Sequence, residues 1–274
     1  MNSNRICIVF LHFLLNISNG YIIIIPCILC TKEECLKVID MHAHILPAID
    51  DGSKSVKMSI EMLNQMYEQG VSVVCATSHY YREQNDIPMF LQRRNNAYQK
   101  LINARGKDAL PMILPASETA FFRGISQCSQ INDLCIFGTN TLMLEMPFTE
   151  WTEQMIEEVE SLVLDRNIRV VLVHPERFCF SKENKNKIRK LMELEIPLQI
   201  NAGSFIDHKT RKLAFELIQM TPFPLLGSDS HNLKSRAPNL KKGREIIRKK
   251  LGDSFIHRIE KNCYRYILDE NYEI

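Results

Sequence analysis

Val38-Ile39-Asp40-Met41-His42-Ala43-His44 is the stretch from which the fold and the chemistry of this chain can be inferred. Its first residues are apolar and predict the end of a buried strand, and its two histidines lie two residues apart. In an extended chain, residues i and i+2 point to the same side, so both imidazoles can reach one point. A metal ion needs such ligands, and Asp51 follows seven residues later as a third candidate. Alone, such a pair is more often two unrelated surface histidines, so the interpretation depends on the rest of the chain.

The composition is that of a soluble globular protein. The 274 residues are 45% hydrophobic and 24% charged, which suits one barrel-sized domain or two small ones. A net charge of +2 gives no reason to expect nucleic acid as a partner. Nine cysteines lie at irregular spacings, and Cys75 and Cys135 lie in apolar runs, where a thiol behaves as a small hydrophobic group. This usage favours a reducing compartment over a disulfide scaffold, so we expect a cytoplasmic protein.

Residues 1–37 differ from the rest of the chain. They contain two apolar runs, 6–15 and 21–30, and neither reaches the roughly 20 residues that a membrane-spanning helix needs. Three interpretations stay open: a leader that associates with a membrane, a signal sequence without a clear cleavage site, and an upstream extension of the reading frame. We favour the last, because regular periodicity begins near Leu36, and we place the folded domain at residues 38–274. Membrane contact is expected only if the extension is part of the working protein.

Beyond residue 36, apolar runs alternate with helical patterns. Most runs are continuous rather than alternating, which is typical of strands buried on both faces of a parallel sheet. Seven such strands separated by helices predict a parallel α/β architecture, and at this length a (β/α) barrel. The predicted strands are 37–42, 71–77, 111–116, 140–145, 169–174, 197–201 and 223–228.

Four helices are predicted between these strands. The spacing of Ile60, Leu63 and Tyr67 predicts the buried face of the first helix. Asp207 is the predicted N-cap of the last helix, because its carboxylate can accept hydrogen bonds from the first free N–H groups. The predicted helices are 55–69, 151–166, 183–195 and 207–220.

Polar side chains follow the predicted strands at their carboxyl ends, where the chemistry of α/β barrels is located. A single histidine there is usually a satisfied core histidine, but here five of the eight histidines and several carboxylates would converge on one rim. Buried carboxylates without partners cost several kcal/mol, so converging ones imply cations. The candidate ligands are His42, His44, Asp51, His79, Glu118, Glu145, His174, Asp229 and His231.

The types of candidate ligand limit which metals and which reactions are expected. All candidates are imidazoles or carboxylates, with no cysteine at a strand end, which suits Mn, Fe or Zn and provides for two or three ions. Clusters of this kind usually activate a bridging water and hold a phosphoryl group. Arg177 and Arg236 offer forked donors for phosphate oxygens, and Arg177 follows His174 by three residues at the same rim.

Five motifs along the body of the chain carry a family resemblance. They are Asp40-Met41-His42-Ala43-His44-Ile45-Leu46-Pro47 with Asp50-Asp51-Gly52, Ala76-Thr77-Ser78-His79, Leu144-Glu145-Met146-Pro147-Phe148, His174-Pro175-Glu176-Arg177, and Ser228-Asp229-Ser230-His231-Asn232 through Arg236. Over about residues 38–268, this combination resembles the PHP (polymerase and histidinol phosphatase) superfamily. Within it, the chain looks like the metal-dependent protein-tyrosine phosphatases of bacterial capsule and exopolysaccharide loci.

The resemblance implies a distorted seven-stranded (β/α) barrel with a trinuclear metal centre, most often of manganese, at the carboxyl ends of the strands. It implies that metal-bound hydroxide attacks phosphotyrosine on a tyrosine autokinase that regulates polysaccharide synthesis. Arg177 and Arg236 match the family's phosphate-binding arginines and are the implied catalytic and substrate-binding residues. Ser78 and Tyr80 stand where the family often has proline and histidine, but neither departure removes a ligand. By the resemblance, His42, His44, Glu118 and Asp229 hold the first ion, Glu118, Glu145 and His174 the second, and Asp51, His79 and His231 the third.

Two other functions stay open. A small-molecule phosphatase of the histidinol phosphatase kind would use the same fold, although Ile45-Leu46-Pro47 with the Asp-Asp-Gly loop looks like the tyrosine phosphatase branch. A metal-stabilised scaffold that binds the kinase without catalysis would be favoured by lost ligands, and none is lost. A thiol-based tyrosine phosphatase is excluded, because it needs Cys-x5-Arg, and Arg82 follows the nearest case, Cys75, one position too late.

Overall fold

The computed structural model describes residues 13–18, 21–26, 37–106 and 110–268. Strands β1 (Phe13–Ser18) and β2 (Tyr21–Pro26) pair with each other in an antiparallel two-stranded sheet. The rest of the segment before Lys37 lies outside the described residues, so the prediction that residues 1–37 are not part of the fold stays a prediction. Within the described residues, no helix is long and apolar enough to cross a membrane.

Seven parallel strands form the second sheet, and they lie side by side in the order in which they follow along the chain. All seven sequence-based strand predictions are confirmed. Three strands run beyond their predicted ends, to Ala43, Tyr80 and Ala120, and because of the last two, His79 and Glu118 are register partners inside the sheet. The strands are β3 (Val38–Ala43), β4 (Val71–Tyr80), β5 (Met112–Ala120), β6 (Thr141–Glu145), β7 (Arg169–Val173), β8 (Leu198–Asn201) and β9 (Pro224–Gly227).

The sheet curls into a nearly closed barrel, because the chain after β9 returns to β3. The N–H of Asp229 donates to the carbonyl of His42 (2.7 Å), and the N–H of His44 donates to the carbonyl of Ser230 (2.9 Å). Ala43 and Ser230 form a parallel bridge. The predicted fold class, a distorted seven-stranded (β/α) barrel, is therefore confirmed, and its closing seam lies at the first histidine motif.

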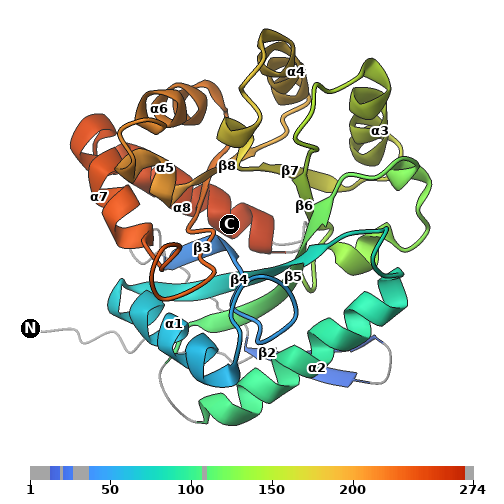
Figure 1. Ribbon diagram of the computed structural model, residues 1–274, viewed down its shortest axis with the longest axis vertical. Coiled ribbons are helices and arrows are strands. Elements are labelled where there is room, and N and C mark those ends of the chain that lie inside the picture. Colours follow the sequence, from blue (N-terminus) through green and yellow to red (C-terminus); the bar gives the residue numbers. More distant parts are fainter. Residues whose placement is uncertain (1–12, 19–20, 27–36, 107–109, 269–274) are drawn as a thin grey trace, which may run out of the picture.

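The helices surround the strands (Figure 1), and α8 packs against β3 and β9. Each of the first four begins at a polar residue whose side chain accepts a hydrogen bond from a backbone N–H: Ser55, Asp86, Thr152 and Ser181. The α-helices are α1 (Val56–Glu68), α2 (Ile87–Arg105), α3 (Glu153–Leu164), α4 (Lys182–Glu193), α5 (Ala202–Ile206), α6 (Arg211–Met220), α7 (Leu240–Leu251) and α8 (Asp253–Ile267). Short 3-10 helices are η2 (Ile125–Gln127), η3 (Ile131–Leu134) and η4 (Pro175–Arg177).

Two helix predictions are wrong in detail. The segment 207–220 is not one helix from Asp207: α6 begins at Arg211, and Asp207 closes α5 instead. Its carboxylate accepts from the N–H of Lys209 (2.9 Å), so it stabilises a turn rather than a helix start. The buried face of α1 is also rotated from the predicted one, because Tyr67 is 53% exposed and Met66 beside it is buried.

Gly227 ends β9 where the barrel closes. A Cβ atom there would lie 2.5 Å from the Cβ of His42 and 2.9 Å from Nε2 of Gln199, both of which are fixed inside the barrel. We expect Gly227→Ala to lower the free energy of unfolding by about 1–3 kcal/mol, because overpacking forces the surrounding atoms apart. Urea unfolding of the variant measures this change.

Gly203→Ala is the matched control, because a Cβ atom there meets only the side-chain nitrogen of Asn239, at 3.4 Å. We expect little loss of stability in this variant. Equal unfolding free energies for the two variants would show that the seam does not require glycine at position 227.

Candidate metal centre

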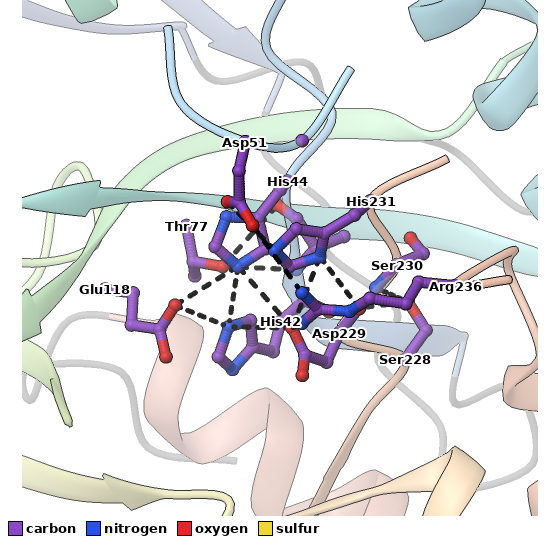
Figure 2. Close-up of polar contacts among 12 residues, drawn as sticks. His42, His44, Asp51, Thr77, Glu118, Ser228, Asp229, Ser230, His231 and Arg236 are labelled. Carbon is purple, nitrogen blue, oxygen red and sulfur yellow. Dashed lines mark hydrogen bonds and ion pairs between the residues drawn. The ribbon is translucent and has the colours of Figure 1, made fainter. Parts of the chain in front are cut away.

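His42 in β3 and His44, the first residue after this strand, have their Nε2 atoms facing each other, 3.1 Å apart (Figure 2). The opposite ring nitrogen of each is hydrogen-bonded: Nδ1 of His42 lies 2.8 Å from Oε1 of Gln199, and Nδ1 of His44 lies 3.0 Å from Oδ2 of Asp50. An amide oxygen and a carboxylate can only accept, so each Nδ1 carries the hydrogen and each Nε2 is left with a lone pair. Two lone pairs directed at each other require a cation between them.

Glu118 supplies the negative charge at this point. Its Oε2 lies 3.3 Å from Nε2 of His42, 3.1 Å from Nε2 of His44 and 3.0 Å from Nδ1 of His79. Its Oε1 lies 2.6 Å from Nε2 of His174. The carboxyl group is buried, and Oε2 has no hydrogen-bond partner. A buried carboxylate oxygen surrounded by imidazole nitrogens, yet without a hydrogen bond, fits a ligand of one or more metal ions.

The local charges favour a cation on these imidazoles. Burial disfavours a charged His44, but the hydrogen bond to Asp50 and the charges of Asp50 and Glu118 outweigh burial and raise the pKa of His44 to about 10. A proton and a metal ion compete for the same Nε2 lone pair, so metal binding here releases protons. The site therefore favours a cation, whether that cation is a proton or a metal ion.

The other candidate ligands extend the cluster in three directions from Glu118. Oδ1 of Asp229 lies 3.7 Å from Nε2 of His42 and 3.6 Å from Nε2 of His44. Oε1 of Glu145 lies 3.6 Å from Nε2 of His174. Oδ1 of Asp51 lies 3.4 Å from Nε2 of His79 and 3.3 Å from Nε2 of His231. The structure thus brings together all nine candidates: His42, His44, Asp51, His79, Glu118, Glu145, His174, Asp229 and His231.

The ligand atoms group somewhat differently from the three sets that the resemblance implies. In each of three groups, the candidate ligand atoms lie within 4.8 Å of one another. His79, implied for the third ion, also groups with Glu118 and Glu145, and His44 also groups with Asp51 and His231. Which ligand holds which ion therefore stays a prediction.

The pKa values of two other candidate ligands, Glu145 and Asp229, are shifted in opposite directions. Burial, together with the charge of Glu118, raises the pKa of Glu145 to about 7. Burial also acts to raise the pKa of Asp229, but the charges of His42 and Arg177 outweigh it and hold that pKa below its usual range. Asp229 is therefore ionised beside a cluster of cationic groups, as a metal ligand should be.

Arg177 and Arg236 both contact Asp229. Arg236 donates from Nη2 to Oδ1 of Asp229 (2.7 Å), and Arg177 forms an ion pair with Oδ2. About a third of each arginine side chain is exposed, 34% and 36%. Each guanidinium is therefore anchored on one side by a buried carboxylate and faces solvent on the other, at the rim of the cluster.

Unusual backbone geometry positions several of these groups. His174 and Asp229 have positive φ angles, 30° and 52°, which cost non-glycine residues about 1–3 kcal/mol each and are concentrated at functional sites. The loop after His44 turns back so closely that a Cβ atom at Gly52 would lie 2.4 Å from the His44 carbonyl oxygen. This turn directs Asp51 toward the histidines.

Four supporting residues were not identified from the sequence as part of the site. Gln199 and Asp50 orient the histidine pair, and Asn201 donates to Oδ2 of Asp229 (2.8 Å). Asp40 accepts from the N–H of Ser228 (2.8 Å) and so supports the seam. A polar glutamine within an apolar strand was the available signal for Gln199, because an inward polar side chain needs a partner.

Glu176 has a structural role within its motif. Its Oε1 accepts from the N–H of Asn201 (2.9 Å) and the hydroxyl of Ser204 (2.8 Å). It therefore joins η4 to the end of β8 and holds the neighbouring Arg177 at the rim.

Comparison with known proteins finds a family model and several similar relatives. The model for capsular polysaccharide synthesis, CpsB/CapC, matches residues 38–269. Tyrosine-protein phosphatase YwqE of Bacillus subtilis (strain 168) is 26% identical over 236 residues, which cover 82% of this chain and 90% of the relative. Tyrosine-protein phosphatase CpsB of Streptococcus agalactiae is 24% identical over 245 residues, covering 86% of this chain and 100% of the relative.

Solved structures show the same fold. A structure from the work on YwqE of Bacillus subtilis and CpsB of Streptococcus pneumoniae, described as unique metal-dependent tyrosine phosphatases, matches with a TM-score of 0.72 at 24% identity. The match covers 84% of this chain and 94% of that one. The Escherichia coli phosphotriesterase homology protein, solved with phosphate in its active site, matches with a TM-score of 0.52 at 11% identity, covering 85% and 99%. The family resemblance inferred from the motifs is confirmed.

Gln199→Met tests whether the support of His42 matters for metal binding. Methionine fills a similar volume, but its sulfur is only a weak hydrogen-bond acceptor for Nδ1, so the ring loses its fixed tautomer. We expect affinity for a divalent ion to fall roughly 10–100-fold, as when other metal-ligating histidines lose their supporting partner. Competition titration of manganese against a chelator measures this affinity without any assay of activity.

Gln199→Glu is the matched control, because its carboxylate keeps an acceptor for Nδ1 of His42. We expect it to retain much more of the affinity than methionine does. Equal affinity in the wild type and in Gln199→Met would mean that this hydrogen bond does not support a metal ligand.

Proposed function

Because the chain belongs to the capsular polysaccharide synthesis family CpsB/CapC, we propose that it is a metal-dependent phosphatase that hydrolyses phosphotyrosine in proteins. One observation carries the proposal. Nine imidazole and carboxylate side chains, the candidate ligands, lie together at the rim of the barrel, with two arginines beside them. Among the described residues, no cysteine belongs to these groups, which argues against a thiolate nucleophile.

We expect two or three divalent ions at this centre, with manganese favoured and iron or zinc as alternatives, because the ligands are nitrogen and oxygen atoms. When bound, such ions supply an activated water and neutralise charge on phosphoryl oxygens. The residues that would hold them are His42, His44, Asp51, His79, Glu118, Glu145, His174, Asp229 and His231.

Arg177 and Arg236 are the proposed catalytic and substrate-binding residues of the chain. Asp229 fixes the direction of both guanidinium groups, so little conformational entropy is lost when they bind a ligand. Their exposed sides can donate paired hydrogen bonds to phosphate oxygens, where negative charge increases in the transition state. Water replaces the tyrosyl oxygen on phosphorus, and the products are inorganic phosphate and a tyrosine side chain.

The proposed substrate is a tyrosine autokinase that regulates capsular or exopolysaccharide synthesis, and the proposed location is the cytoplasm. The curated relatives are named tyrosine-protein phosphatases, and the family description refers to capsule synthesis, which support this choice. The retention of all candidate ligands argues against a scaffold without catalysis. Histidinol phosphate remains the rival substrate to exclude by experiment.

Metal removal tests the proposed chemistry. We expect chelated protein to lose turnover of a phosphotyrosine peptide and to recover it on addition of manganese, iron or zinc. The same reconstituted protein should hydrolyse the peptide much faster than histidinol phosphate. Full activity without metal contradicts the mechanism, and preference for histidinol phosphate contradicts the proposed substrate.

Single substitutions of His174 and Arg177 should both lower turnover, but only the first should also lower metal content. His174→Ala removes a proposed ligand, so metal content and turnover should fall together. Arg177→Ala leaves every proposed ligand in place, so metal content should hold while turnover drops roughly 100-fold or more, since a preorganised donor contributes on the order of 3–4 kcal/mol. Metal analysis alongside peptide kinetics separates the two effects.

Arg177→Lys is the conservative control. It keeps the positive charge but loses the forked geometry, so it should recover only part of the turnover. Near-normal turnover in Arg177→Ala would show that Arg177 only forms an ion pair with Asp229 and does not contribute to catalysis.

A further inference from the structure

Phe148 is an exposed aromatic side chain at the rim of the metal centre. It follows β6 three residues after Glu145, and it is 60% exposed. Tyr67 and Leu164, which are exposed to a similar degree, lie in the last turns of α1 and α3. These helix ends return to the opposite rim of the barrel, where the next strands begin. Phe148 thus exposes apolar surface at the rim where the proposed ligands lie.

The backbone on both sides of Phe148 is held in place. The indole N–H of Trp151 donates to the carbonyl of Pro147 (3.1 Å), and the side-chain amide of Asn184 donates to the carbonyl of Thr149 (3.0 Å). The same Asn184 side chain accepts from the N–H of Trp151 (2.9 Å), and both of these residues are buried. A fixed loop therefore presents the exposed ring, and its position is determined before any ligand binds.

Aromatic contacts connect Phe148 to the metal centre. Its ring centroid lies 4.9 Å from that of Phe178, which is fully buried, with 57° between the ring planes. The Phe178 ring lies 5.6 Å from the ring of His174, a proposed ligand. Phe178 thus supports one part of the Phe148 ring and leaves the rest free. Two successive aromatic contacts therefore connect Phe148 to His174 in the cluster. Arg177, one residue before Phe178, occupies the same rim.

We propose that Phe148, supported by Phe178, forms a wall of an aryl subsite that binds the phenyl ring of phosphotyrosine beside the metal centre. This inference rests on the proposed function and deepens it. A single oxygen joins the phenyl ring to phosphorus, so a phosphate held by Arg177 places the ring at this part of the rim. Aromatic pairs attract at centroid distances of about 4.5–7 Å, which a ring resting on Phe148 can reach.

The subsite should make the protein prefer aryl over alkyl phosphoryl groups. Phenylphosphonate and methylphosphonate carry the same charged group, cannot be hydrolysed at the carbon–phosphorus bond, and differ in the ring. Calorimetry of the manganese-loaded protein gives the ratio of their dissociation constants. We expect the wild type to bind phenylphosphonate more tightly. Phe148→Ala should reduce that preference about tenfold, because the ligand's ring no longer has an aromatic surface to pack against.

Matched variants separate the subsite from a structural role. Tyr67→Ala removes an aromatic ring of similar exposure at the opposite rim and should keep the wild-type preference. Phe148→Tyr keeps a ring and should restore the preference, while metal content should be the same in all variants. Loss of metal from Phe148→Ala would overturn the proposal, because it would assign the residue to the structure of the metal centre.

The result also distinguishes this inference from the proposed function. If the wild type hydrolyses a phosphotyrosine peptide and Phe148→Ala keeps the full preference for phenylphosphonate, the subsite is wrong and the phosphatase stands. If the reconstituted wild type does not hydrolyse the peptide, the proposed function fails, and the subsite fails with it.

Discussion

The burial of the Glu118 carboxylate is the constraint on which the rest of the site depends. A charge withdrawn from water costs several kcal/mol unless opposite charge surrounds it. Here four imidazoles surround it, from His42, His44, His79 and His174, and the cations that they are proposed to hold would supply that opposite charge. The imidazoles come from three different strand ends, and only the closed barrel brings them to one carboxylate. Metal ions held at this point, as proposed, would neutralise charge that the barrel has buried.

The closing seam connects this electrostatic arrangement to the stability of the barrel. Backbone hydrogen bonds from Asp229 to His42 and from His44 to Ser230 complete the seam with the same segments that carry three proposed ligands. Gly227 lets the last strand approach the Cβ of His42. A change that opens the seam therefore displaces the ligands as well, so barrel stability and metal affinity should change together.

The parts of the structure that could be predicted are those that one strong sequence pattern determines. Continuous apolar runs predicted all seven strands, and polar residues at their ends predicted the nine candidates that the barrel brings together. Other parts could not be predicted, because there the local sequence pattern and the tertiary contacts conflict. The helix α2 was missed because Gln92-Arg93-Arg94-Asn95-Asn96 interrupts its apolar pattern, although Arg94 is buried in the fold. The supporting roles of Gln199 and of Asp50, which lies in a quoted motif, were not predicted, because they depend on which imidazole the folded chain places beside each residue.

Anomalous diffraction from crystals grown with manganese tests the central claim most directly, because it locates each ion without any assay of activity. The account predicts at least two anomalous peaks that share Glu118, each at coordination distance from a carboxylate oxygen or imidazole nitrogen of the cluster. Arg177 and Arg236 should face the open side of these peaks. A single peak away from Glu118, or no peak at the rim of the barrel, would contradict the assignment of this cluster as a metal centre.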